Sequence, residues 1–169
     1  MSKARRLIGL DPGLRFTGWG LIEVEGNRLH HIDSGYIASD SNLDISRRLQ
    51  QIHDGLSRVF ENHTPDEAAV EETFVNKNPN STLKLGLARG IALVIPAIFG
   101  IPVAEYSANT VKKSIVGAGH ATKEQMGLMV KNILPGCDPQ NSDAADALAL
   151  AICHAHFSET RQKWRKENY

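Results

Sequence analysis

The chain is poor in cysteine and in aromatic residues, and it has no excess of charge of either sign. Among its 169 residues there are 2 cysteines, 6% are aromatic, and 19 Lys and Arg residues balance 19 Asp and Glu residues. Cys137 and Cys153 form no Cys-X-X-Cys pair, which excludes a disulfide framework and a zinc ribbon and predicts two reduced, semi-buried thiols. The formal net charge of zero gives no first sign of a nucleic-acid partner.

The sequence also lacks a long uninterrupted hydrophobic run. Its most apolar stretch, residues 91–105, is interrupted by Pro96, Gly100 and Pro102 and is shorter than the roughly 20 residues that span a bilayer. Near the N-terminus an Asp-Pro-Gly turn stands where a signal peptide would have its apolar core. We therefore expect a cytoplasmic protein with no membrane association.

The composition is that of a globular protein. Hydrophobic residues make up 41% of the chain and charged residues 22%, and a chain of this length buries one sizeable core. Residues 1–157 are expected to form a single domain. Residues 158–169 carry four basic residues and little apolar periodicity, which is typical of a mobile tail.

Hydrophobic periodicity predicts an α/β fold with a five-stranded mixed sheet flanked by helices. Three strands joined by short turns come first, and a helix with Ser41 or Asn42 as its cap follows them. The expected strands are 5–11, 16–24, 28–38, 67–71 and 101–106, and the expected helices are 42–63, 81–99, 107–116, 122–134 and 141–157.

Four acidic residues stand at the ends of these elements. Asp11 ends the first strand directly before a Pro-Gly turn, and Glu71 ends the fourth strand. Asp143 and Asp146 share one face at the start of the last helix. Carboxylates gathered at one place repel one another strongly unless cations lie between them. Two Mg²⁺ ions fit such an oxygen-rich set and catalyse phosphodiester displacement, so the pattern predicts hydrolysis of a nucleic-acid backbone.

Each acid also has a structural interpretation. An Asp before Pro-Gly is a common turn former, which fits Asp11 taken alone. Asp143 and Asp146 would each suit a helix N-terminus, where a negative charge complements the helix dipole. The residues after Asp146, A-L-A-L-A-I, are small and apolar, however, and an unpaired charge on such a face is costly. Taken together, the four acids favour a metal site.

Three segments carry a family resemblance: I-G-L-D-P-G-L-R-F-T-G-W-G, V-E-E-T-F-V-N-K-N-P-N-S-T-L-K-L-G-L-A-R-G and D-A-A-D-A-L-A-L-A-I-C-H. In this order and at these spacings they closely resemble the RuvC family of bacterial crossover junction endodeoxyribonucleases, over residues 5–157. The resemblance implies an RNase H-like fold, a homodimer, and Mg²⁺-dependent paired nicking of four-way (Holliday) DNA junctions in recombination and DNA repair. It also implies 5′-phosphate and 3′-hydroxyl ends and a partnership with the RuvA-RuvB branch-migration complex.

Carried over motif by motif, the catalytic and metal-binding residues are Asp11, Glu71, Asp143 and Asp146, with two Mg²⁺ ions per site and Mn²⁺ able to substitute. Only one of Glu71 and Glu72 can face the metals, because side chains alternate along a strand. The family pattern V-E-x-x-F assigns Glu71.

Five residues are candidates for DNA contact. The resemblance favours Lys112 and Lys123 as phosphate contacts, and Lys84 and Arg89 are further candidates. Any one of these cations taken alone is also explained as a solvated surface charge. Phe74, in the polar loop after the fourth strand, is either a stacking platform for a base, as the resemblance suggests, or a lid packed on the core. Because the chain is formally neutral, the four acids leave four excess positive charges elsewhere, enough for a basic DNA surface.

The apolar helix 81–99 is the candidate dimer interface, because Gly86 and Gly90 allow a second helix to approach closely; burial inside one chain is the alternative. His154 and His156 are two residues apart on a helix and point about 200° apart, so shared metal ligation is not expected. For His120 the sequence identifies no partner.

Other functions compete with junction resolution. An RNase H-like nuclease for other branched substrates and a junction binder without cleavage would both fit the motifs, although four intact acids argue against lost catalysis. The Asp-Pro-Gly segment also resembles the phosphate loop of actin-like ATPases. Those enzymes need a second domain and a second glycine-rich loop, which this chain lacks.

Overall fold

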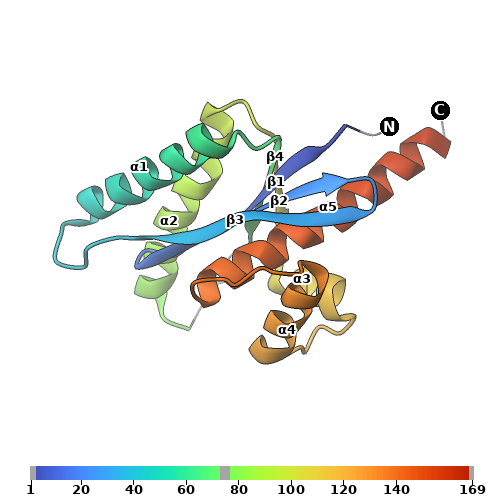
Figure 1. The fold of residues 1–169 in the computed structure, drawn as a ribbon. Helices are drawn as coiled ribbons and strands as arrows, with labels where there is room; N and C mark the ends of the chain where they lie inside the picture. The colour runs from blue at the N-terminus through green and yellow to red at the C-terminus, as the bar shows by residue number, and fades with distance from the viewer. Residues whose placement is uncertain (1–2, 73–76, 168–169) are drawn as a thin grey trace.

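A mixed five-stranded sheet forms the centre of residues 3–72 and 77–167, the parts of the chain that the computed structural model describes (Figure 1). The strands are β1 (Arg5–Asp11), β2 (Phe16–Glu25), β3 (Arg28–Ala38), β4 (Glu67–Glu71) and β5 (Val103–Tyr106). Their order is β3-β2-β1-β4-β5, antiparallel from β3 to β1 and parallel from β1 to β5. The predicted sheet is confirmed, although its last strand begins at Val103 rather than at Ile101.

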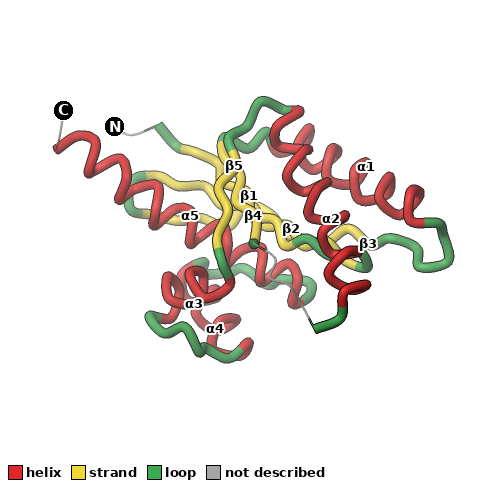
Figure 2. Tube along the Cα trace, turned by 180° about the vertical axis from the view of Figure 1, so that it is seen from behind, coloured by secondary structure: helices red, strands yellow, loops and turns green. Residues whose placement is uncertain are grey.

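Helices cover both faces of this sheet. Those of the described residues are α1 (Ile45–His63), α2 (Pro79–Ile98), α3 (Ala108–Val116), α4 (Lys123–Ile133) and α5 (Ser142–Glu167). α1 and α2 lie on one face, whereas α5 crosses the other face with α3 and α4 beside it (Figures 1 and 2).

Two helix boundaries differ from the prediction by three residues or more. Neither Ser41 nor Asn42 caps α1: the Asn42 N–H donates to Asp40 Oδ1 at 2.9 Å, which closes a turn, and the helix begins only at Ile45. At the other end of the chain, α5 continues to Glu167 instead of ending near residue 157. The mobility of residues 158–169 stays a prediction.

Each face of the sheet has its own hydrophobic core. Leu7 and Leu148 belong to the core between the sheet and α5, which also contains the free cysteines Cys137 and Cys153, buried as expected. Leu10 belongs to the second core, under α1 and α2. Because side chains alternate along a strand, the residues next to Leu10 in β1, including Asp11, face α5.

Glycines in the sheet bring α5 unusually close to it. A Cβ on Gly9 in β1 would lie 1.9 Å from the carbonyl oxygen of Ala147, and a Cβ on Gly18 in β2 would lie 2.1 Å from that of Asp143. Any side chain at these two positions would therefore collide with the helix backbone. The backbone of α5 thus rests directly on β1 and β2, and this contact fixes the start of α5 above the end of β1.

Helix α2 presents an uncovered apolar side. Leu83 is 70% exposed and Ile98 63% exposed, and a Cβ on Gly86 or Gly90 would meet no atom within 4 Å. By length and composition α2 is also apolar enough to cross a membrane, and most of that apolar window is unburied. Its other side, which includes Ala88, belongs to the core under α1.

Candidate active site

The four predicted acids meet at one edge of the sheet. Asp11 ends β1 and Glu71 ends β4, and the register of these parallel neighbours places the two residues side by side. Val70 packs into the core under α1, so Glu71 faces α5, as Asp11 does. Glu71 therefore lies on the same face as Asp11, whereas Glu72 is exposed, and the choice of Glu71 as the metal ligand stays a prediction.

The start of α5 places the other two acids above this edge. The Asn141 side chain caps the helix, since its Oδ1 accepts the N–H of Ala144 at 2.9 Å, and its Nδ2 donates to Asp143 Oδ2 at 3.3 Å. Asp146 follows one turn later on the same face. The backbone of Asp143 lies against Gly18, so the first turn of α5 is held over β2 beside Asp11.

The carboxylates raise one another's pKa. Burial raises the pKa of Asp11 to about 8, with further contributions from the charges of Glu71, Asp146 and Asp143. Burial and the charge of Asp146 also raise the pKa of Glu71, and burial raises that of Asp146. A side-chain hydrogen bond joins Asp11 and Glu71. The site therefore contains more negative charge than its own groups neutralise.

Two lysines lie at this cluster. Lys112 on α3 and Lys123 at the start of α4 line a cavity of about 220 Å³ together with Glu71 and Asp146. Both lysines act to lower the pKa of these two carboxyls, against the effect of burial. The remaining lining residues are mostly apolar: Ala108, Val111, Ala121, Met126 and Ala149. The cavity is thus lined by carboxylates and by lysines, which suits a phosphate held beside cations.

The donor set fits hard divalent cations. All four acids offer carboxylate oxygens, the ligands that Mg²⁺ prefers, and the raised pKa of Asp11 shows a demand for positive charge. Among the described residues, no three His, Cys, Asp or Glu side chains already stand in the arrangement that would hold one ion.

Comparison with known proteins identifies the family. The model of the family described as crossover junction endodeoxyribonuclease RuvC matches residues 7–154. The chain belongs to the RuvC family. A RuvC crossover junction endodeoxyribonuclease from Paramagnetospirillum magneticum is 59% identical over 158 residues, which cover 94% of this chain and 95% of that protein. One from Granulibacter bethesdensis is 55% identical, covering 95% and 90%.

Solved structures of RuvC proteins share the fold. Thermus thermophilus RuvC in complex with a Holliday junction substrate superposes with a TM-score of 0.86 at 32% sequence identity, over 92% of this chain and 96% of that one. The yeast mitochondrial Holliday junction resolvase Ydc2 has a TM-score of 0.69 at 15% identity, over 96% of this chain and 82% of that one, which is a likeness of fold alone. The expected RNase H-like fold is therefore confirmed.

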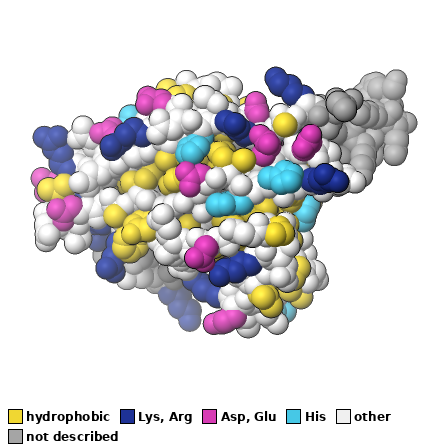
Figure 3. All heavy atoms as spheres, viewed as in Figure 1, with side chains coloured by type: hydrophobic (Ala, Val, Ile, Leu, Met, Phe, Trp, Pro, Cys, Tyr) yellow, Lys and Arg dark blue, Asp and Glu magenta, His cyan; other side chains and the backbone are white. Residues whose placement is uncertain are grey.

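Two other predicted DNA contacts of this RuvC-family chain, Lys84 and Arg89, do not line the cavity. Lys84 is exposed on α2. Arg89 forms an ion pair with Glu105 on β5, which joins α2 to the sheet, and its contact with DNA stays a prediction. Phe74 lies outside the described residues. On the face shown in Figure 3, Lys and Arg side chains lie along the upper and the lower edges, and acidic side chains are interspersed among them.

Sequence reasoning missed a hydrogen-bonded chain between α5 and the sheet. His154 is buried, not an ordinary helix-end histidine: Tyr106 Oη lies 2.8 Å from its Nδ1, and its Nε2 lies 2.8 Å from Glu67 Oε2. Glu67 also pairs with Arg5. These bonds tie α5 to β1, β4 and β5. No local pattern shows this, because the partners are far apart in the chain.

Two other histidines, His156 and His120, were also considered from the sequence. His156 Nδ1 lies 3.1 Å from Ser114 Oγ, which links α5 to α3. His120 is exposed in the connection between α3 and α4. The prediction that His154 and His156 do not ligate one metal together is consistent with their separate partners.

Proposed function

We propose that this chain is a metal-dependent endonuclease that resolves four-way DNA junctions by paired nicks, leaving 5′-phosphate and 3′-hydroxyl ends, in recombination and DNA repair. The observation that carries the proposal is the acidic cluster at the ends of β1 and β4 and the start of α5, facing Lys112 and Lys123 across one cavity. In a member of the RuvC family, this arrangement supports cleavage rather than binding alone.

Asp11, Glu71, Asp143 and Asp146 would hold two Mg²⁺ ions, or Mn²⁺ in their place. When bound, such ions supply activation of the attacking water and stabilisation of the leaving oxygen in phosphodiester hydrolysis. Asp11 must lose its proton to act as a ligand. Its pKa is raised because a buried carboxylate beside other carboxylates is unfavourable when no cation is bound. The lysines then hold the phosphate against the acidic wall of the cavity.

We also propose that α2 forms the interface of a homodimer. Leu83, Leu87, Val94 and Ile98 are exposed at helical spacing, and Gly86 lies beside this stripe. A second copy related by a two-fold axis would cover the stripe and present a second active site to the two-fold junction, which needs two incisions. Burial in this dimer interface would also explain why α2 is apolar over most of its length, so that no membrane is needed to cover it.

Replacing Gly86 by leucine is expected to weaken this dimer at least about tenfold. Nothing lies within 4 Å of a Cβ at this position, so the substitution leaves the single chain unstrained and acts only on a facing helix. Sedimentation velocity over a concentration series measures the change. Gly127→Leu on α4, where a Cβ is equally free, is the matched control and leaves the dimer unchanged. Identical dissociation constants for both variants would remove α2 from the interface.

Because the proposed substrate is DNA, we propose that the enzyme acts in the cytoplasm. The RuvA-RuvB branch-migration complex is the proposed partner that delivers junctions to it. Residues 1–157 remain the proposed nuclease domain, with residues 158–169 as a basic appendage to it.

The direct test uses a mobile four-way junction and a linear duplex of the same sequence, each incubated with the purified chain and Mg²⁺ or EDTA. Symmetric nicks on the junction alone, dependent on Mg²⁺, are the expected result, read on native and denaturing gels. Junction binding without nicks would favour the non-cleaving binder. Cleavage of flaps or RNA-containing duplexes in preference to junctions would favour the broader nuclease.

A further inference from the structure

A row of three paired residues crosses the sheet at the active site. Asp11 on β1 pairs with Gly18 on β2, and Gly18 pairs with Tyr36 on β3. Directly paired residues point to the same face of a sheet, so the Tyr36 side chain lies on the α5 face, like the Asp11 carboxylate. Ile37, next in the chain, packs against Gly55 of α1 on the opposite face, which agrees with this assignment.

Tyr36 lies just beyond the first turn of α5. That turn sits over Gly18, where the backbone of Asp143 occupies the space of a side chain. Strands are about 4.8 Å apart, so Tyr36 begins about 10 Å from the β1 backbone, on the far side of Asp143 from the lysine cavity. Along a stacked DNA strand this distance corresponds to about three nucleotides.

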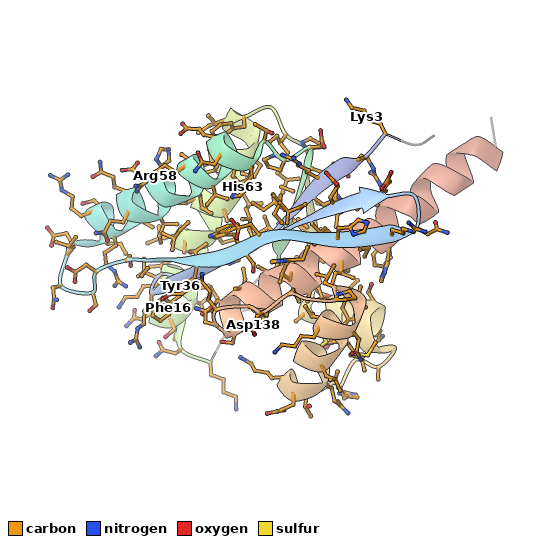
Figure 4. All side chains as sticks on the ribbon, viewed as in Figure 1. Lys3, Phe16, Tyr36, Arg58, His63 and Asp138 are labelled. Atoms are coloured by element: carbon orange, nitrogen blue, oxygen red, sulfur yellow. The ribbon has the colours of Figure 1, made fainter. Side chains whose placement is uncertain are left out.

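At this place a half-buried and an exposed aromatic ring, Phe16 and Tyr36, form a pair. Phe16 and Tyr36 meet edge to face, with ring centroids 5.3 Å apart and an interplanar angle of 89°. Tyr36 is 41% exposed although it stands on a sheet face, where a large apolar ring is normally covered. Figure 4 shows the two side chains next to each other at the same end of the sheet. The pair belongs to neither hydrophobic core.

A positive charge accompanies the rings. The Arg15 guanidinium lies over the Phe16 ring, 5.1 Å from its centroid, and its side chain is exposed. Exposed rings together with an arginine are the combination that binds unstacked nucleotides, since a base stacks on the ring and the guanidinium meets a phosphate. Only Gly18 separates Tyr36 from Asp11 in this row of the sheet. Because the site lies so near the acids, the expected ligand is a DNA strand.

We propose that Phe16, Tyr36 and Arg15 form a nucleotide-binding surface for the DNA strand that continues past the scissile phosphate on the β3 side of Asp143. The strand would run from Lys112 and Lys123, across the acids, to this aromatic surface. A base unstacked near the crossover lies on the rings and Arg15 contacts its phosphate. This inference rests on the proposed junction-cleaving function and specifies which residues hold the strand there.

The test is junction binding by fluorescence anisotropy in EDTA, with single substitutions that remove a ring and keep the bulk: Tyr36→Leu and Phe16→Leu. Each is expected to weaken binding about tenfold, as loss of one base–aromatic stack does. Tyr36→Phe keeps the ring and stays close to the original affinity. Ile32→Ala, another exposed apolar residue on β3, is the matched surface control and leaves binding unchanged.

A second measurement locates the contact. Junction strands carrying 5-bromouracil at successive positions are irradiated in the complex, and the cross-linked peptides are identified by mass spectrometry. Cross-links to Phe16 or Tyr36 from a position near the cut, lost in the leucine variants, support the surface. If the unaltered chain cuts junctions but both leucine variants bind normally and no cross-link maps there, this inference is overturned and the function stands. If the unaltered chain neither binds nor cuts junctions, both fail.

Discussion

Asp11→Asn is expected to abolish junction cleavage, by at least about a thousandfold, while junction binding survives. The substitution removes one carboxylate from the cluster of four and leaves Lys112 and Lys123 in place to contact the DNA. Cleavage is measured as nicks per unit time in Mg²⁺, and binding as anisotropy in EDTA. Glu71→Gln, Asp143→Asn and Asp146→Asn are expected to behave in the same way.

Asp138→Asn is the matched control for this series. Asp138 precedes α5, lies outside the cluster and pairs only at the surface with Lys131, at 3.5 Å. The control retains full cleavage. Cleavage within tenfold of the unaltered protein in any cluster variant would remove that residue from the catalytic set, and loss of junction binding would indicate a damaged fold instead.

The same Asp11→Asn variant is expected to be more stable than the unaltered protein when metal is absent. The pKa of Asp11 is raised from 3.8 to about 8, so between these values the folded chain binds more protons than the unfolded chain. Stability therefore falls as pH rises from about 4 to about 8. In EDTA at pH 8, the asparagine variant should melt at least about 3 °C higher, by calorimetry, and the difference should shrink toward pH 4. An equal or lower melting temperature at pH 8 would contradict this account of the site.

Gly9→Ala is expected to cause the largest loss of stability of any single methyl group added to the chain. The new Cβ would lie 1.9 Å from the carbonyl oxygen of Ala147 and 2.8 Å from the amide nitrogen of Ala151. Backbone atoms cannot rotate away, so α5 must lift from the sheet. A fall in melting temperature of about 10 °C or more is expected.

Gly127→Ala is the control for this loss of stability, because its Cβ would meet nothing within 4 Å on α4. It should leave the melting temperature unchanged or raise it slightly, since alanine favours a helix over glycine. If Gly9→Ala melts like this control, the close contact between α5 and β1 is not present in solution.

The parts of the molecule that sequence predicted correctly are those that depend on neighbouring residues. Alternation and turns identified β1 to β3, and the acids stand at strand or helix ends, which local pattern locates well. Parallel pairing of β1 with β4 then places Asp11 beside Glu71 without further information. Alternation within a single strand predicted that only one of Glu71 and Glu72 faces the metals, and the family resemblance assigned Glu71.

What sequence failed to predict depends on contacts between distant segments. The ion pair between Arg89 and Glu105 could not be predicted, because Glu105 becomes close only when α2 packs beside β5. The role of His154 was judged only from its spacing to His156 on the helix. Its hydrogen bond to Glu67 could not be predicted in that way, because it joins residues 87 positions apart. Phe16 and Tyr36 likewise become a pair only through the register of β2 and β3.

The direct seating of α5 on glycines also divides the nuclease into a fixed and an adaptable part. Asp11, Asp143 and Asp146 belong to elements whose backbones touch, so the spacing of these carboxylates cannot follow the shape of the DNA. Lys112 and Lys123 stand on α3 and α4, outside that contact. We therefore expect any adjustment to different junction shapes to involve the lysine-bearing helices more than the carboxylates.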